Sequence, residues 1–275
     1  FRRVLFRSKV IKDLGLVYDC SIEEGAQGGM DGSNFLWPYT LHKGSPGHDA
    51  GWFGSDNNTN AIKIGNTPGL WEFPNYQAIV PTDDACSKYG ISSGLRDRMK
   101  ANVDWFEPAN GKVTSFDYNL WATKKWSAFE LEGEEVSAIL KYSLDVRYDG
   151  NRSPFMFGFH SQYYTEDWAD QPDNTPNADL ADMKKAVEDF IDYALEKDDV
   201  RIVTGIDVIN WCRNPVSLNT TSVKTNHVTM KANSSINKVS SNLMNITIPN
   251  DGRSEEHTSE LQSHSDLVCR LLLEK

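Results

Sequence analysis

Apolar residues recur at helical spacing in two stretches of the chain. Within residues 134–148, Val136, Ile139, Leu140 and Leu144 fall on one side of a helix. Residues 178–197 carry a longer stripe of the same kind, formed by Leu180, Met183, Val187, Phe190, Ile191, Ala194 and Leu195. Both stretches are predicted to be helices that bury one face.

Shorter apolar runs lie beside these helices. Phe155–Phe159 follows Pro154 as a continuous apolar run, which is typical of a buried strand. Val200–Thr204 is predicted as a second strand, and Ile206–Arg213 as a short helix that ends before Pro215. The alternation of strand and helix predicts an α/β fold with parallel strands.

The first half of the chain is less regular. Residues 9–14 have the spacing of a last helical turn with Gly15 placed to cap it, and the apolar run 16–18 precedes Asp19 where a strand would end. Residues 23–75 are rich in Gly, Asn, Asp and Pro, which for so long a stretch indicates functional surface. From residue 217 the composition becomes rich in Ser, Thr and Asn, so 217–252 is predicted to be a linker and the start of a β-rich module.

Both ends resemble translated sequencing adapter rather than protein. Residues 253–264 read RSEEHTSELQSH, residues 265–275 read SDLVCRLLLEK, and residues 1–8 read FRRVLFRS with the same Arg-Ser join. The alternative is a basic N-terminal arm and a short amphipathic C-terminal helix, but adapter-like sequence at both ends favours the first interpretation. We therefore expect 1–8 and 253–275 not to be natural protein, and 9–252 to be a fragment truncated on both sides.

Composition narrows the class of protein. Of the 275 residues, 39% are hydrophobic and 11% aromatic, which is typical of a globular chain. The net charge of −11 argues against nucleic acid or an anionic membrane surface as partner, and no run approaches the roughly 20 apolar residues of a membrane span. Cys20, Cys86 and Cys212 of the natural part fit either one disulfide with a free thiol or three thiols.

His160 is the first candidate for chemistry. It directly follows the apolar run 155–159, where a parallel strand reaches its C-terminal end and catalytic residues of α/β folds collect. A hydrogen-bonded structural histidine is the alternative interpretation of such a position.

The run NRSPFMFGFHSQYY (151–164), the helix before it and DDVRIVTGIDVINWCRNP (198–215) resemble the end of polysaccharide deacetylases, carbohydrate esterase family four with the NodB-homology domain. LGLVYDCSI (14–22), WPYTL (37–41) and PGLWEFP (68–74) resemble successive blocks of the chitin-deacetylase-like subgroup. The matches keep their order over residues 9–216, which we therefore interpret as the C-terminal part of such a domain.

The resemblance implies a distorted (β/α) barrel whose N-terminal strands are missing from this chain. It implies hydrolysis of N-acetyl groups in chitin or a related N-acetylglucosamine polymer, in a secreted or periplasmic protein. In that family a divalent metal, usually zinc, is held by one Asp and two His and activates water. The metal-and-base, His-rich and R-x-P motifs are expected before Lys9, so we expect this fragment to hold no metal and to be inactive.

The resemblance also assigns roles within the chain. His160 matches the histidine that protonates the leaving amine. Asp19 is the candidate for its carboxylate partner, although only Y-D-C-S remains of the family block and Asp19 capping a turn is an equal alternative. Trp37, Trp71 and Phe159 are candidates for sugar binding, with anchoring of the loops as the alternative for the two tryptophans.

Two further functions stay open at this point. A non-catalytic carbohydrate-binding relative would keep the fold and the aromatic loops without the metal residues. A structural extracellular protein on the same fold is the third possibility. His160 favours the enzyme, because a binding protein has no use for a protonating group.

Overall fold

The computed structural model of the chain describes residues 2–20, 22, 24, 35–43, 67–121, 129–165, 179–215 and 268–273. The predicted linker and β-rich start at 217–252, and most of the polar stretch 23–75, lie outside the described residues. The described elements are, in chain order, α1 Arg2–Asp13, β1 Tyr18–Asp19, β2 Tyr39–Thr40, β3 Trp71–Glu72, β4 Gln77–Ile79, α2 Asp83–Cys86, η1 Ser87–Tyr89, α3 Leu95–Asn102, β5 Lys112–Thr114, α4 Asp117–Leu120, α5 Gly133–Asp149, β6 Phe155–Gly158, η3 Ser161–Tyr164, α6 Leu180–Leu195, β7 Val200–Ile202, α7 Gly205–Arg213 and β8 Val268–Leu273.

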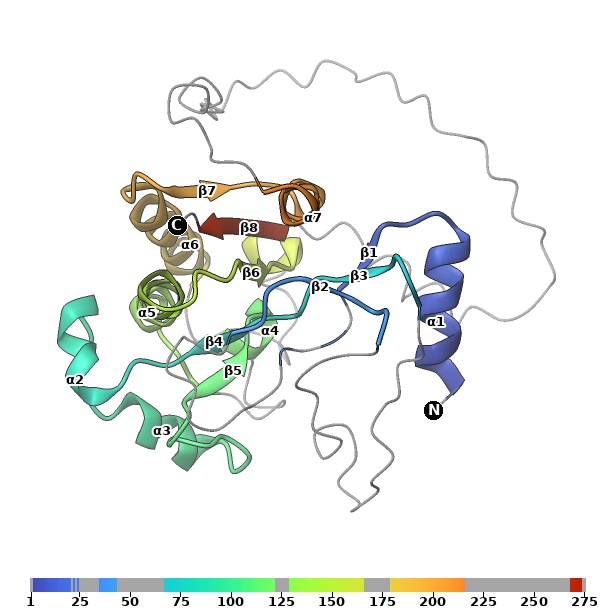
Figure 1. Ribbon diagram of the computed structural model, residues 1–275. Helices are drawn as coiled ribbons and strands as arrows, with labels where there is room; N and C mark the ends of the chain where they lie inside the picture. Colours follow the sequence, from blue (N-terminus) through green and yellow to red (C-terminus); the bar gives the residue numbers. More distant parts are fainter. Residues whose placement is uncertain are drawn as a thin grey trace. The chain divides into compact units, whose positions relative to one another are not determined.

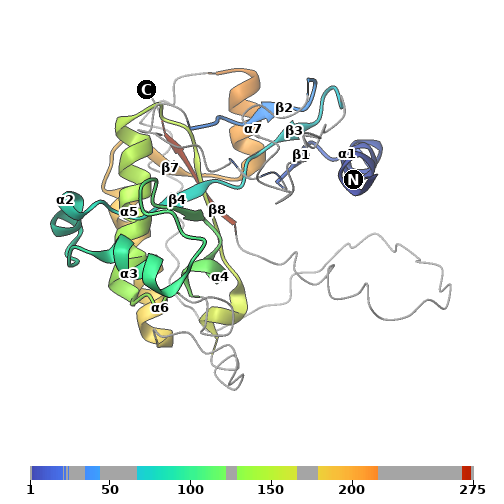
Figure 2. The same cartoon turned by 90° about the horizontal axis from the view of Figure 1, so that it is seen from below.

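Helix α5 organises the described core. Its first turn is fixed by a capping box, in which Glu132 and Glu135 each bond the other's backbone. The predicted apolar face is fully buried, with Val136, Ile139 and Leu144 all at 0% exposure. The helix packs beside α6 and against strands β4 and β6 (Figures 1 and 2). The prediction of a helix over 134–148 is confirmed.

The other predicted elements are confirmed as well, with boundaries shifted by a few residues. Helix α6 begins after Asp179, whose side chain accepts a hydrogen bond from the Asp182 N–H, and buries its apolar stripe through Met183 and Phe190. Helix α7 has a capping box of the same kind at Thr204. At the end of α1, residue Gly15 has φ 75° and lets the Leu16 N–H bond the Ile11 carbonyl.

The described strands form three small sheets. Strand β3 lies between β1, to which it is parallel, and β2, to which it is antiparallel. Strands β4 and β5 form an antiparallel pair, and β6, β8 and β7 form a third sheet in that order. The chain is therefore a mixed α/β structure, as predicted, and the described strands do not close into a barrel.

The third sheet includes part of the adapter-like C-terminal sequence. Strand β8 lies between β6 and β7 and is antiparallel to both, with Phe155 opposite Leu271 and Val200 opposite Leu273 (Figure 1). Strands β6 and β7 consequently run in the same direction, as predicted, but are not neighbours. Helix α1 likewise runs across residue 8, the predicted end of the N-terminal adapter. These contacts show where the two terminal segments lie in the fold. That the segments derive from sequencing adapter stays a prediction.

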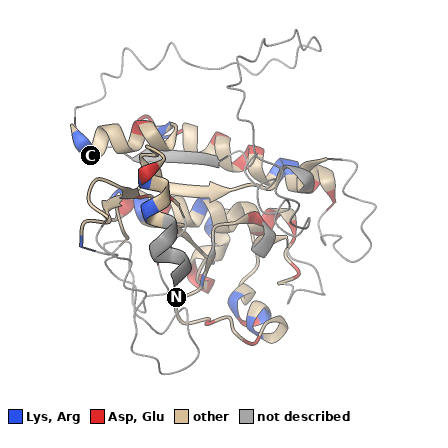
Figure 3. Ribbon diagram, turned by 90° about the vertical axis from the view of Figure 1, so that its right-hand side faces the viewer, with Lys and Arg blue, Asp and Glu red and all other residues tan. Residues whose placement is uncertain are grey.

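None of the described helices is long and apolar enough to cross a membrane. Basic and acidic side chains are interspersed along the described helices (Figure 3).

Candidate functional site

A parallel β-bridge joins the segment that follows β5 to the end of β6, and this bridge positions the candidate site. Phe116, two residues after β5, pairs in parallel with Gly158 at the end of β6. The Gly158 N–H donates to the Ser115 carbonyl oxygen at 3.1 Å. Because parallel segments end on the same side, the residues that follow, Asp117 and His160, are brought together.

Asp117 and His160 share two hydrogen bonds. The His160 backbone N–H donates to Asp117 Oδ2 at 2.7 Å, and His160 Nδ1 lies 2.5 Å from Asp117 Oδ1. The Asp117 side chain is 0% exposed, whereas that of His160 is 23% exposed. The carboxylate therefore fixes the imidazole through Nδ1, and the ring is partly exposed.

Burial and hydrogen bonding act on the Asp117 carboxyl in opposite directions. Burial is the largest influence and raises the pKa of Asp117 above its ordinary value, while the hydrogen bonds from His160 act in the opposite direction. An ionised carboxylate beside an imidazole stabilises the charge of the ring whenever the ring is protonated. The dyad can thus hold a proton and deliver it to a group that approaches Nε2.

Aromatic rings flank the dyad. The Phe116 ring lies 6.4 Å from the His160 ring and the Tyr163 ring 5.8 Å, centroid to centroid. On the side of the carboxylate, Trp121 Nε1 donates to the Tyr164 hydroxyl at 3.0 Å, and the Tyr164 hydroxyl hydrogen-bonds Asp117.

The structure corrects the expected carboxylate partner of His160. His160 Nδ1 is hydrogen-bonded to Asp117, and not to Asp19. Asp19 ends strand β1, where its Oδ1 accepts from the Cys20 N–H at 2.9 Å, which is the turn-capping alternative considered from sequence. A catalytic part for Asp19 stays a prediction.

The signal that could have found Asp117 was available in the sequence. It is a carboxylate placed directly after the short run KVTSF, as His160 is placed directly after an apolar run.

The two predicted sugar-binding tryptophans both lie in contact with α7. Trp37 stacks on Trp211 with ring centroids 5.7 Å apart, and its Nε1 donates to the Asn151 carbonyl oxygen at 3.2 Å. Trp71, in β3, has the Arg213 guanidinium 5.8 Å from its ring centroid. Both indoles are partly exposed, so anchoring and binding are compatible at each.

Phe159, the third predicted substrate residue, is mostly enclosed. Its side chain is 6% exposed and lies edge-on to Phe157 at 4.3 Å and to Tyr164 at 5.8 Å. Its observed role is packing beneath the dyad, and its contact with substrate stays a prediction.

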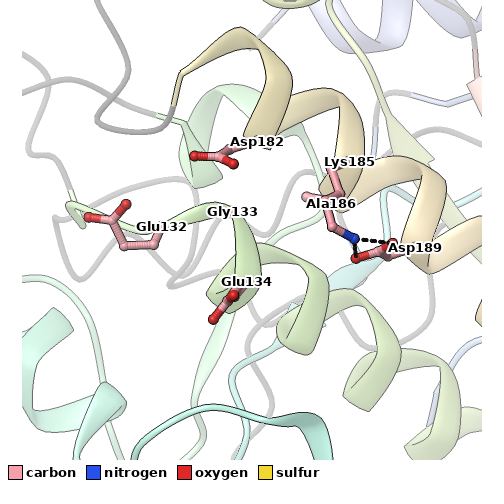
Figure 4. A pocket seen from close by; sticks show the side chains of 7 residues that line it. All are labelled: Glu132, Gly133, Glu134, Asp182, Lys185, Ala186 and Asp189. Atoms are coloured by element: carbon pink, nitrogen blue, oxygen red, sulfur yellow. Dashed lines mark hydrogen bonds and ion pairs between the residues drawn. The ribbon is translucent and has the colours of Figure 1, made fainter.

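A separate hollow of about 360 Å³ lies between the start of α5 and α6 (Figure 4). It is lined by acidic side chains together with the ion pair of Lys185 and Asp189, whose Nζ–Oδ2 distance is 2.6 Å. None of the residues selected from sequence lines it. This lining offers no aromatic face on which a sugar could stack, so we do not place the function there.

The described part of the chain also holds cysteines and several potential metal ligands. Within that part of the chain, no group of three or more His, Cys, Asp or Glu is placed to hold a metal ion. Among the described residues no disulfide joins Cys20, Cys86 or Cys212 to another cysteine, and Cys86 is buried. Burial raises the pKa of Cys212 to about 11, which keeps it protonated near neutral pH.

Comparison with known proteins gives no relative: no protein-family model, no curated protein and no solved structure matches the chain.

Proposed function

We propose that the chain carries the proton-donating side of a polysaccharide deacetylase acting on chitin or a related N-acetylglucosamine polymer. The observation that carries the proposal is the pair of His160 and Asp117, a partly exposed imidazole held through Nδ1 by a fully buried carboxylate. The motifs around His160 that resemble the deacetylase family give the proposal its substrate class.

Deacetylation needs such a proton donor at one defined step. Water attacks the acetamide carbonyl, the C–N bond breaks, and acetate and a free amine are formed. The nitrogen leaves only if it takes up a proton as the bond breaks, and His160 Nε2 can supply it. Asp117 keeps the proton on Nδ1 in place, orients the ring and stabilises its charged form until the transfer.

The remaining features of the proposal rest on the family resemblance. They are a distorted (β/α) barrel, a secreted or periplasmic location, and a divalent metal that would activate the attacking water. The described residues supply no ligand set for that metal, so we derive no step through it. The resemblance places its ligands in sequence before Lys9.

The substrate would lie against the aromatic side chains. The faces of indole rings stack on the C–H surfaces of sugars, and Trp71 and Trp37 both keep exposed ring surface. The same tryptophans support the second candidate function, a non-catalytic carbohydrate-binding protein, because they could bind sugar without the dyad.

The test is release of acetate from N-acetylated chito-oligosaccharides by the complete protein of which this chain is a part. We expect His160→Ala to lower kcat by about two to four orders of magnitude, as for loss of a general acid. His42→Ala is the matched control, because His42 is exposed and lies outside the site. Near-normal acetate release by His160→Ala would overturn the assignment. Binding of oligosaccharide by a wild type that releases no acetate would favour the second candidate.

A further inference from the structure

A second layer of side chains stands behind the carboxylate of Asp117. The Tyr164 hydroxyl lies between Trp121 Nε1, which donates to it at 3.0 Å, and the Asp117 carboxylate, to which it is also hydrogen-bonded. The Trp121 side chain is 2% exposed. Burial is the largest influence on the Tyr164 hydroxyl and raises its pKa, so it stays protonated.

The direction of these hydrogen bonds follows from the chemistry of the groups. An indole N–H can only donate, so the Tyr164 oxygen is the acceptor of the bond from Trp121. The hydroxyl has one hydrogen of its own, and a carboxylate can only accept. The Tyr164 O–H is therefore directed at Asp117, and the tryptophan fixes which way it points.

Local structure places the four residues together. Asp117 is the first residue of α4, and the Trp121 N–H bonds the Asp117 carbonyl at the end of that single turn. His160 directly precedes the 3-10 turn η3, whose last residue is Tyr164, and the Tyr163 N–H bonds the His160 carbonyl at 3.0 Å. Each one-turn helix thus begins at or directly after a member of the dyad and ends at or directly before a member of the second layer.

We infer that Tyr164, oriented by Trp121, is a positioning residue that sets the orientation and the proton affinity of the Asp117–His160 pair. Its catalytic meaning rests on the proposed function, whereas its effect on proton affinity can be measured without substrate. The resemblance to deacetylases assigns no role to Tyr164, although the resembling run 151–164 includes it.

The expected effect has a definite sign. A hydroxyl that donates to the Asp117 carboxylate disperses its charge and lowers its affinity for a proton. A less basic carboxylate holds the imidazolium less tightly, so His160 gives up its proton more readily. In Tyr164→Phe the carboxylate loses this donor, becomes more basic and holds the imidazolium more strongly. The titratable groups facing the pair include His160, Tyr164 and, from the same turn, Tyr163.

The test is the titration of the His160 side chain by NMR in the full 275-residue chain. We expect the midpoint to move to higher pH in Tyr164→Phe and to lower pH in Asp117→Asn, which removes the charge instead. Tyr193→Phe is the matched control, because it also removes a hydroxyl that donates to a carboxylate, at Asp145 Oδ2 with 2.6 Å. A midpoint in Tyr164→Phe equal to that of the wild type and of Tyr193→Phe would overturn the inference.

A measurement on the wild type covers the case in which Tyr164→Phe does not fold. The indole N–H resonance of Trp121 should follow the His160 midpoint, because the Tyr164 hydroxyl connects the two. A Trp121 resonance that does not change through that midpoint would contradict the proposed hydrogen-bond chain from Trp121 through Tyr164 to Asp117 and His160 (the relay).

Activity separates this inference from the proposed function. In the complete protein, Tyr164→Phe should lower kcat about 3- to 10-fold and move the basic limb of its pH profile to higher pH. A shifted midpoint in a protein whose wild type releases no acetate supports the relay and rejects the deacetylase. Acetate release with an unshifted midpoint rejects the relay and keeps the deacetylase.

Discussion

The buried ion pair of Arg147 and Glu24 is the interaction whose loss should cost the fold most. The two side chains are 0% and 1% exposed, with Nη2 and Oε2 2.8 Å apart. Arg147 also donates to Ser153 Oγ at 2.9 Å and to the Gln77 carbonyl at 3.1 Å. Its guanidinium carbon lies 3.9 Å from the centroid of the Phe35 ring. The pair therefore connects α5, strand β4 and the segment that leads to Trp37.

The magnitude follows from burial. Removing one member of a fully buried pair leaves the other charge without compensation in a low-dielectric interior, which typically costs about 3–5 kcal/mol. We expect this loss for Arg147→Met, which keeps most of the side-chain length. Glu24→Gln should cost a similar amount, because it leaves the Arg147 charge unpaired and turns an amide NH2 toward N–H donors that a carboxylate oxygen now accepts. The double variant should lose less than the sum of the two, since no unpaired charge remains.

The assay is urea unfolding at neutral pH, evaluated as the free energy of unfolding of each variant. Arg98→Met is the matched control, because its partner Glu135 lies at 2.5 Å but the two side chains are 44% and 17% exposed. Pairs of that kind contribute about 0–1 kcal/mol. If Arg147→Met lowered the free energy of unfolding by no more than Arg98→Met does, the expected cost of breaking this buried ion pair would be refuted.

Two further predictions concern acid stability and packing at the dyad. Burial, the largest effect, raises the pKa of Asp145, but hydrogen bonds from Lys88 and other donors outweigh it and the pKa is lowered. The Asp145 carboxylate then stabilises the fold above about pH 4, and this contribution is lost as the pH falls through the folded-state pKa. Asp145→Asn should therefore flatten the decline in urea-measured stability between about pH 5 and about pH 3, and an unchanged slope would contradict this. Gly158→Ala places a methyl group into the Phe116 ring, and the overlap should cost about 1–3 kcal/mol and alter the His160 titration. An unperturbed His160 spectrum would show that the ring moves aside without effect on its neighbour Asp117.

Local patterns in the sequence were sufficient to predict the helices and to select His160 as a candidate, whose catalytic role stays a prediction. The stripe through Val136, Ile139 and Leu144 identifies α5 because its apolar spacing matches the helical repeat, and the side chains are buried as that spacing requires. His160 was selected because a histidine directly after a buried strand lies where catalytic residues of α/β folds collect, with a hydrogen-bonded structural histidine as the alternative. The helices and the position of His160 are determined by residues that are close together in the sequence.

Contacts between residues that are far apart in the sequence could not be predicted from such local patterns. Asp117 reaches His160 only through the bridge of Phe116 and Gly158, which are 42 residues apart by number, so Asp19 seemed the better carboxylate from the order of blocks. Trp211 was not selected from the sequence, and only its stacking on Trp37 brings it to one of the predicted sugar-binding tryptophans. The insertion of β8 between β6 and β7 has no signal in either strand.

The central claim is that Asp117 and His160 act together as the acid that releases the amine. Its most direct test compares Asp117→Asn with Asp19→Asn in the acetate-release assay on the complete protein. The account predicts that Asp117→Asn lowers kcat by about two to four orders of magnitude while Asp19→Asn stays within about threefold of the wild type. Loss of activity in Asp19→Asn with near-normal activity in Asp117→Asn would contradict it.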